Sequence, residues 1–451
     1  MTSGGPDPLL DGWEQLGWRE RRQRRFGRWL SGSRVEFADD AAREAYTERV
    51  QLLIDAVTLK KPARVPVAAA VGFFPAAHAG FTKREAMDDG EKSAAALLKF
   101  HEDFRPDFQA RPVAPSRVFE RLGLRFVDWP GRGLADDVAW QYVEDEYMRA
   151  DEYDALIADP EAFFRRTLLP RFGGAFAGLA MPGPFSDMME AGGLPFNILP
   201  FADPAVAESV LRIAEAARAS AAWLGATRAA DAEAAGRLGI PPEFGGSAKA
   251  PYDILADTLR GTRGIMTDLF RRPDKIQAAA ARLVPLVIDS AVRQAAWAEA
   301  PLIVFWLHKG ADGFMSGEGF RSCYWPSLKA VLVGLIEQGI VPMLFVQGCY
   351  DGRLEVIADD DLPAGSAIWW FDKTDMRAAA RAFAGRACIA GNVPSALLAL
   401  GGAHEVEQYV TSLLDDCARD GGFFLRNGAS LDEAKAENLT AMIDAGRAWR
   451  G

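Results

Sequence analysis

Cysteine, histidine and excess positive charge are all scarce in this sequence of 451 residues. The four cysteines, Cys323, Cys349, Cys388 and Cys417, are widely spaced, which excludes a disulfide framework and indicates reduced thiols. The formal net charge of -11 argues against a nucleic-acid surface, since such a surface needs excess Lys and Arg. No apolar run reaches the roughly 18 residues of a membrane span, and the N-terminus lacks an apolar signal core. We therefore expect a cytoplasmic protein with no nucleic-acid or membrane partner.

Residues 19–28 are the local exception, because they hold six arginines. The flanking Trp18, Phe26 and Trp29 favour an amphipathic helix packed on the body of the protein, and contact with a phosphate or an anionic lipid is the alternative. The chain has no internal repeat, low-complexity tract or linker. We expect an N-terminal helical extension over residues 1–50 and a single domain over residues 51–451.

Short apolar runs, each ending in a polar or glycine-rich turn, alternate with segments of helical periodicity in the last 150 residues. The runs are apolar at consecutive positions, so both faces of each strand should be covered, as in a parallel sheet wrapped by helices. Such alternation is restricted to barrels and open doubly wound sheets. The predicted strand cores are residues 302–307, 341–346, 367–371, 387–390 and 422–425.

Two helices support this pattern. One begins near Pro326 and stops at Gly339, and the other carries an apolar stripe from Val406 to Cys417. Upstream the pattern is looser. Residues 64–74 are predicted to form an early strand, and the Gly- and Pro-rich residues 173–200 are expected to be a long surface loop or flap.

In a barrel, the residues just after each strand converge on one mouth, where barrel enzymes place their functional groups. Aromatic side chains near this mouth would either line a pocket for a ring-bearing substrate or seal the core. The candidates after the strands are His308, Gln347, Cys349, Asp372, Asn392 and Asn427, and the tryptophans are Trp306, Trp325, Trp369 and Trp370.

His308 precedes a glycine-bearing turn, which suits a metal ligand or proton shuttle, or a histidine that only bonds a loop carbonyl. Lys309 and Asp312 share that turn and are candidates to bind or neutralise a polar substrate. Asp372 ends a tryptophan-rich strand, so its carboxylate suits acid/base chemistry, or it caps the helix that starts near Asp375.

Cys349 lies beside Gly348, where the backbone can approach a ligand closely. As a thiolate it would bind zinc or attack an electrophile. One cysteine without a spaced partner is a weak metal signal, because zinc needs at least three protein ligands.

Several segments spread over nearly the whole chain, together with the strand end at Asp372, match one known family in order and spacing. The segments are LKKPARVPV (59–67), DEYDALIADPEAF (151–163), APYDILADTLRGTRG (250–264), FMSGEGF (314–320), AGNVP (390–394), GGFFLRNG (421–428) and AENLTAM (436–442). Through these segments the chain resembles the uroporphyrinogen decarboxylase superfamily. The resemblance implies a (β/α)8 TIM barrel with a deep cleft, often a homodimer, and either decarboxylation of a porphyrinogen or transfer of a methyl group with a corrinoid protein.

Two departures from the family matter. The decarboxylases carry an N-terminal Arg-Gln-Ala-Gly-Arg signature for substrate carboxylates, and this chain has none. The zinc-dependent methyltransferases place His-x-Cys after the strand that ends here at Val346 and a further cysteine after the last strand. Gln347 and Cys349 stand in the first motif, and residues 428–430 hold no cysteine. The resemblance thus implies no zinc site of that type, and the cofactor is left unknown.

We therefore expect an α/β enzyme, a (β/α)8 TIM barrel with an N-terminal helical extension, of the methyltransferase-like branch. It would act on a methylated or carboxylated small molecule, with a corrinoid protein as a possible partner. The expected catalytic residues are Asp372 and His308, and the expected substrate contacts are Gln347, Cys349, Asn392, Lys309, Asn427 and Trp370. The alternatives are a uroporphyrinogen decarboxylase and a non-catalytic barrel that binds a corrinoid or tetrapyrrole.

Overall fold

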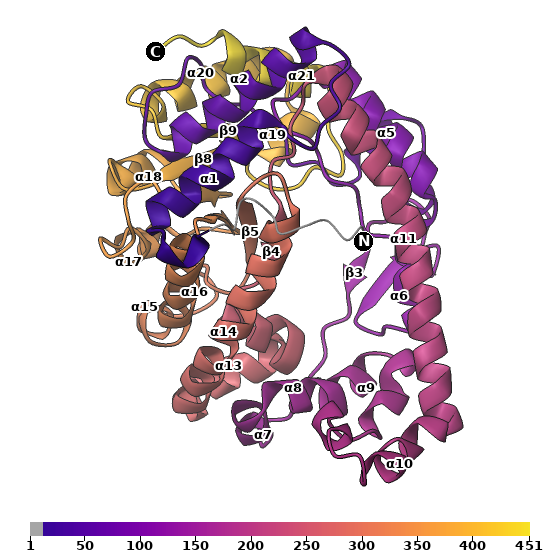
Figure 1. Cartoon of the computed structure of the whole chain (residues 1–451). Helices are drawn as coiled ribbons and strands as arrows, with labels where there is room; N and C mark the ends of the chain where they lie inside the picture. The colour runs from indigo at the N-terminus through magenta and orange to yellow at the C-terminus, as the bar shows by residue number, and fades with distance from the viewer. Residues whose placement is uncertain (1–11) are drawn as a thin grey trace.

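The structure, a computed structural model, describes residues 12–451 and has a parallel sheet of six strands at its centre (Figure 1). The strands lie in sequence order across the sheet, so each crossover joins neighbouring strands. They are β4 (Gly246–Ala248), β5 (Leu302–Leu307), β6 (Val341–Val346), β7 (Ile368–Phe371), β8 (Cys388–Val393) and β9 (Phe423–Asn427). All five predicted strand cores are strands, and the predicted α/β fold with a parallel sheet is confirmed.

Alternate residues of each strand pack into two different apolar layers. In β5, Ile303 and Phe305 belong to a layer shared with the surrounding helices, whereas Leu302 and Val304 belong to a second layer shared with the N-terminal helices. Because both faces of the sheet are covered, consecutive strand positions are apolar.

The helices that follow the strands carry the predicted apolar stripes. They are α16 (Trp325–Glu337), which ends before Gly339 in the left-handed region (φ 68°), and α20 (Ala403–Cys417). The other helical elements of this half are α12 (Pro251–Asp253), η7 (Ile254–Arg260), α13 (Gly261–Arg271), α14 (Pro273–Trp297), α15 (Gly317–Gly319), η8 (Phe320–Tyr324), η9 (Asp351–Arg353), α17 (Leu354–Ile357), α18 (Met376–Phe383), α19 (Ser395–Leu400) and α21 (Ala436–Ala448).

Residues 64–74, predicted as an early strand, pair with β9 without forming a continuous strand. Ala68 N donates to Leu425 O (3.0 Å), and the remaining contacts include isolated bridges. The side chain of Asn427 replaces backbone partners here, because its Oδ1 accepts the N–H of Ala70 and its Nδ2 donates to the Ala70 carbonyl. The backbone hydrogen bonds expected between this strand and its neighbour are therefore replaced in part by bonds from the side chain of Asn427.

Further backbone hydrogen bonds lead from residues 64–74 round to β5. They join Asp107 N to Val67 O, Gln109 N to Pro241 O and Gly245 N to Leu302 O, over 2.9, 3.0 and 2.8 Å. These bonds connect both ends of the six-stranded sheet to irregular extended segments.

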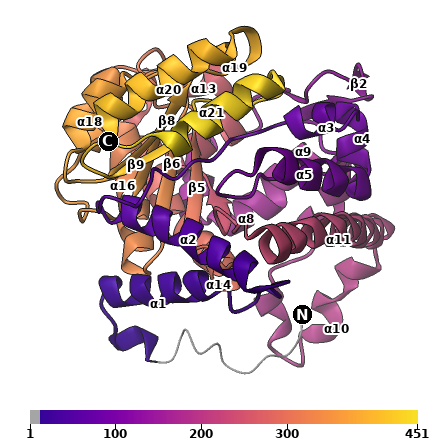
Figure 2. The same ribbon diagram turned by 90° about the horizontal axis from the view of Figure 1, so that it is seen from above.

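The N-terminal helices α1 (Trp18–Ser31) and α2 (Asp40–Val57) pack beside the strands (Figure 2). Arg25 donates to Gln338 O (2.9 Å), just before β6, and Arg28 donates to Ala298 O (2.7 Å), just before β5. Both carbonyls are at helix C-termini, whose dipoles favour a cation. The arginine-rich stretch is thus a helix packed on the body at the amino ends of the strands, and the domain boundary expected at residue 50 falls inside α2.

An inserted arm spans residues 111–240, and the long helix α11 (Pro204–Leu238) runs along it (Figure 1). Within residues 12–451, no helix is both long and apolar enough to cross a membrane. The remaining elements before α11 are η2 (Trp13–Gln15), α3 (Phe74–His78), α4 (Lys83–Asp88), α5 (Gly90–Phe104), α6 (Ser116–Leu122), β1 (Val127–Pro130), β2 (Gly133–Leu134), β3 (Gln141–Tyr142), α7 (Tyr153–Ala158), α8 (Pro160–Phe163), η3 (Phe164–Leu168) and α9 (Leu169–Phe172).

The long loop or flap predicted over residues 173–200 is wrong in its local structure. Short helical segments fill it, because its glycines and prolines let the chain pack closely on α11, where Gly178 N donates to Ser209 Oγ (3.0 Å). The segments are η4 (Gly174–Ala180), η5 (Phe185–Met188), α10 (Leu194–Asn197) and η6 (Leu199–Ala202).

Replacing the buried Arg25 with alanine should lower the free energy of unfolding by about 2 to 3 kcal/mol, since carbonyls at two helix C-termini lose a charged donor. Urea denaturation of wild type and Arg25→Ala measures the difference. The exposed Arg19, which lies over the ring of Trp18, provides the control, and Arg19→Ala should change the free energy of unfolding by under about 0.5 kcal/mol. Equal losses in the two variants would contradict the assignment.

His101 on α5 should make stability fall with acidity. Its Nε2 accepts the N–H of Ala110 (2.9 Å), and burial lowers its pKa from 6.5 to about 4. Between those pH values His101 is protonated in the unfolded chain but neutral in the native protein. The free energy of unfolding therefore drops as pH falls, by at most ~1.4 kcal/mol per pH unit. Denaturation between these pH values should show a shallower decline for His101→Gln, which keeps an acceptor, and an unchanged decline for the exposed His404→Gln.

Candidate functional site

Three of the predicted site residues follow neighbouring strand ends. Leu307 pairs with Val346, and Val346 pairs with Phe371, so the carboxyl ends of β5, β6 and β7 are level. His308, Gln347 and Asp372 come directly after these ends. The structure therefore brings them to one edge of the sheet, opposite the edge that α1 covers.

The imidazole of His308 is held by one carboxylate. Its Nδ1 lies 2.7 Å from Oδ2 of Asp257 in η7. Within residues 12–451 no group hydrogen-bonds its Nε2, and 29% of the side chain is exposed. A histidine oriented through Nδ1 with its Nε2 accessible can accept or donate a proton.

Asp257 also attracts two ammonium groups. Lys249 Nζ lies 2.8 Å from its Oδ2, and Lys309 Nζ lies 3.5 Å from its Oδ1. Burial acts to raise the pKa of Asp257, but the hydrogen bond from His308 and the charge of Lys249 outweigh it and hold the pKa below its ordinary value. The carboxylate is therefore ionised and able to stabilise a protonated imidazole.

Asp253, one helical turn before Asp257, fixes the turn that carries His308. It is fully buried, and its carboxylate accepts the N–H groups of His308 (3.1 Å) and Lys309 (3.0 Å). The hydroxyl of Tyr324 donates to the same carboxylate (2.8 Å). Burial and the neighbouring Asp257 raise the pKa of Asp253. Asp253 touches the backbone of the site rather than its open side, so it is a positioning residue.

Lys309, expected to bind substrate, is engaged within the protein. Its Nζ donates to Thr262 Oγ1 (2.7 Å), and it lies 4.6 Å from the ring centre of Phe314. It also approaches Glu144 (3.7 Å), which belongs to the arm. Lys309 thus links the arm to the carboxyl edge of the sheet.

The side chain of Asp372 is partly exposed and accepts the N–H of Gly348 (3.1 Å). The alternative role as a helix cap belongs to Asp375 instead, whose carboxylate accepts the N–H groups of Arg377 and Ala378 at the start of α18. Asp372 is therefore available at the edge.

Both predicted asparagines are used in structural contacts. Asn392 Nδ2 donates to the carbonyls of Asp372 and Thr374, while its Oδ1 accepts the hydroxyl of Tyr409 (3.0 Å). Asn427 is fully buried and pairs with Ala70, as described above. These bonds occupy both amides.

The residues after β6, where the resemblance places the zinc ligands of related methyltransferases, do not fit that metal. Gln347 is exposed, and the thiol of Cys349 donates to Asp351 (3.1 Å). Burial, followed by the Asp351 carboxylate, raises the pKa of Cys349, which disfavours the thiolate that binds zinc. Among residues 12–451, no group of three or more His, Cys, Asp or Glu is arranged to hold a metal ion.

The tryptophans are divided between the two layers. Trp306 and Trp370 belong with Phe345 to the layer shared with the N-terminal helices, and the ring centres of Phe345 and Trp370 are 4.2 Å apart. Trp325 and Trp369 belong to the helix-facing layer, so the expectation that they lie near the mouth is wrong for these two. For Trp369 the cause is the alternation of side chains along a strand, which sends Trp369 and Trp370 to opposite faces, whereas Trp325 lies on α16 outside the sheet. Trp370 is itself buried, with its Nε1 bonded to the carbonyl of Asn427.

Sequence reasoning missed Lys249, Asp253, Asp257 and Tyr324. The first three follow β4, which has only three residues, so no apolar run marked it as a strand. The available signal was the spacing of two aspartates by four residues, which places both on one helical face.

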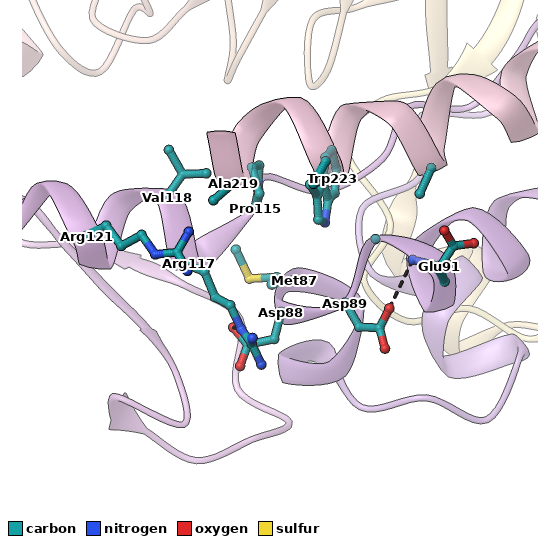
Figure 3. A pocket seen from close by; sticks show the side chains of 13 residues that line it. Met87, Asp88, Asp89, Glu91, Pro115, Arg117, Val118, Arg121, Ala219 and Trp223 are labelled. Atoms are coloured by element: carbon teal, nitrogen blue, oxygen red, sulfur yellow. Dashed lines mark hydrogen bonds and ion pairs between the residues drawn. The ribbon is translucent and has the colours of Figure 1, made fainter. Parts of the chain in front are cut away.

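A pocket of about 490 Å³ lies elsewhere, between α4, α5, α6 and α11 (Figure 3). Asp88 and Asp89 line it, but Asp89 caps α5 and Asp88 is bonded to Ser116 and ion-paired with Arg132. A second pocket of about 500 Å³ shares these two aspartates. Neither pocket includes a residue of the cluster around His308.

The protein is thus an α/β protein with a cluster of ionisable groups around His308 at the carboxyl edge of a parallel sheet. The chain belongs to the uroporphyrinogen decarboxylase (URO-D) family, whose model matches residues 179–449. A methyltransferase from Methanosarcina mazei has a similar solved structure, with a TM-score of 0.58 at 16% identity, covering 89% of this chain and 98% of that one. At this identity the likeness shows the fold. No curated protein sequence matches the chain.

Removing the hydroxyl of Tyr324 should lower the free energy of unfolding by about 1 to 3 kcal/mol, because the buried Asp253 loses a donor. Thermal and urea unfolding of Tyr324→Phe measures the loss. Tyr252 supplies a matched control, since it is equally buried nearby and its hydroxyl has no hydrogen-bond partner in the described chain. Tyr252→Phe should be neutral, and a similar loss in both variants would refute the role of the Tyr324 bond.

Proposed function

We propose that this chain is an enzyme that transfers a methyl or other one-carbon group from a small molecule bound at the carboxyl edge of the sheet. The observation that carries the proposal is the pair formed by His308 and Asp257, with Nε2 of the imidazole left accessible. Membership of the URO-D family and the fold shared with a methyltransferase support it.

The chemistry needs a proton at the departing atom. When a nucleophile takes a methyl group from an oxygen, nitrogen or sulfur atom, the bonding electron pair stays on that atom. His308, protonated and stabilised by Asp257, would donate its Nε2 proton there, and solvent would restore it. Asp372, two strands away, would orient the substrate or assist this transfer, with Gln347 and Cys349 as contacts.

The proposal includes closure of the sheet into a (β/α)8 barrel. The backbone bonds of residues 64–74, 107–110 and 241–245 support closure, since they run from β9 round to β5 beside β4. In such a barrel the carboxyl edge is the mouth where functional residues meet. The N-terminal extension would lie at the other end, followed by the barrel.

A reduced corrinoid on a partner protein is the acceptor that we propose for the methyl group. It would supply the nucleophile, because the raised pKa of Cys349 disfavours the thiolate that could otherwise attack the methyl group. Homodimer formation and a cytoplasmic location belong to the same proposal.

The test mixes the purified protein with cob(I)alamin, without oxygen, and a panel of methyl donors comprising an aryl methyl ether, a methylamine, a methyl thioether and methanol. Methylcobalamin formation is followed in the absorption spectrum. His308→Ala and Asp372→Asn should each reduce turnover at least about 100-fold, because a positioned acid or base contributes that much. The exposed His404→Ala should leave turnover unchanged, and the melting temperatures of the two site variants establish that they fold.

Three outcomes contradict the proposal. Unchanged kinetics in both site variants would show that neither His308 nor Asp372 is catalytic. Carbon dioxide loss from uroporphyrinogen, seen by mass spectrometry without methyl transfer to cobalamin, assigns a decarboxylase instead. Tight cobalamin binding without product from any donor assigns a non-catalytic carrier or sensor.

A further inference from the structure

The end of the arm exposes an unusual number of large apolar side chains. Within the described chain, nine of the eighteen exposed large hydrophobic residues fall in residues 181–211, which we call the arm tip. Phe185 is 76% exposed, Phe196 72% and Met189 85%. The others are Met181, Leu194, Ile198, Leu199, Val210 and Leu211. Such a concentration marks an interaction site rather than the ordinary scatter of surface apolar groups.

The arm tip is built on a fixed scaffold. Adding a Cβ to Gly178 would place it 2.3 Å from the Ala205 carbonyl, so η4 lies directly against α11. Arg165 ties the following turn by donating to the carbonyls of Leu179 (3.1 Å) and Pro182 (2.7 Å). The turn that leads into the arm tip is therefore packed against α11, and α10 lies at the far end of the arm (Figure 1).

The charges of the arm tip are all negative. Between Arg171 and Arg212 the sequence has no lysine or arginine, but it has four carboxylates, Asp187, Glu190, Asp203 and Glu208. Asp203 caps α11, and Asp187, Glu190 and Glu208 are exposed. An apolar surface whose own charged side chains are all carboxylates complements an apolar surface that carries basic groups.

We propose that the arm tip docks a partner protein that presents apolar side chains ringed by lysine and arginine. Self-association through the same patch would bring carboxylates together around a two-fold axis, which like-charge repulsion opposes. An anionic membrane surface would repel the same carboxylates. The proposal does not depend on the proposed function, because the arm tip shares no residue with the cluster around His308.

The probe is a labelled amphipathic helical peptide with a leucine face flanked by lysines, and its twin carries glutamates in place of the lysines. Fluorescence anisotropy measures binding of each to the full chain. The lysine peptide should bind at least about 10-fold more tightly than the glutamate peptide, and its affinity should fall between about 0.1 M and about 1 M salt. Equal binding of the two peptides overturns the proposal.

Matched variants separate the arm tip from the general negative charge of the protein. The double variant Phe185→Ser with Phe196→Ser keeps every charge and should weaken the lysine peptide at least about 10-fold. Phe270→Ser removes a ring on α13 that is 85% exposed, more than either ring of the double variant, and should have no effect. Equal weakening by the two variants refutes the site. If light scattering shows a dimer that is lost in the double variant, the arm tip is a dimer interface and the proposal is overturned. Binding to anionic vesicles would overturn it as well, because it assigns the surface to a membrane.

Discussion

Parallel pairing of the strands is the constraint on which the rest of the structure depends. It places every carboxyl end at one edge and every amino end at the other, so the two edges acquire different chemistry. At the amino edge, α1 inserts arginines among helix C-termini, where carbonyls and dipoles favour cations. At the carboxyl edge, His308, Gln347 and Asp372 follow three level strand ends. The contacts of α1 that stabilise the fold and the candidate catalytic residues therefore lie at opposite ends of the strands.

The carboxyl edge combines a buried acid with a partly exposed base. Burying Asp253 is costly in free energy, and two backbone N–H groups and the Tyr324 hydroxyl offset that cost. In return the turn that carries His308 has one fixed conformation, and Asp257 sets the orientation of its ring. Lys249 and Lys309 balance the charge of Asp257. The two aspartates thus have different roles, since Asp253 holds the backbone of His308 and Asp257 holds its side chain.

Sequence patterns predicted the strands of the C-terminal half because each run from β5 to β9 is buried on both faces and is therefore continuously apolar. They also placed His308 and Asp372 at strand ends. They missed Asp253 and Asp257 because β4 is too short to leave an apolar signature, and they overestimated Asn427 because its partner, Ala70, is 357 residues away. Trp369 was misplaced for a local reason, since neighbouring strand residues face opposite ways. Tertiary pairing, which no single window of sequence records, accounts for these differences.

Asp257 holds His308 with its Nε2 accessible at the carboxyl edge, and the catalytic role proposed for His308 depends on this arrangement. Modification with diethyl pyrocarbonate, mapped residue by residue with mass spectrometry, tests it most directly, because the chain has only four histidines. His308 should react much faster than the buried His101 in the folded protein. A His308 that reacts as slowly as His101 would contradict it.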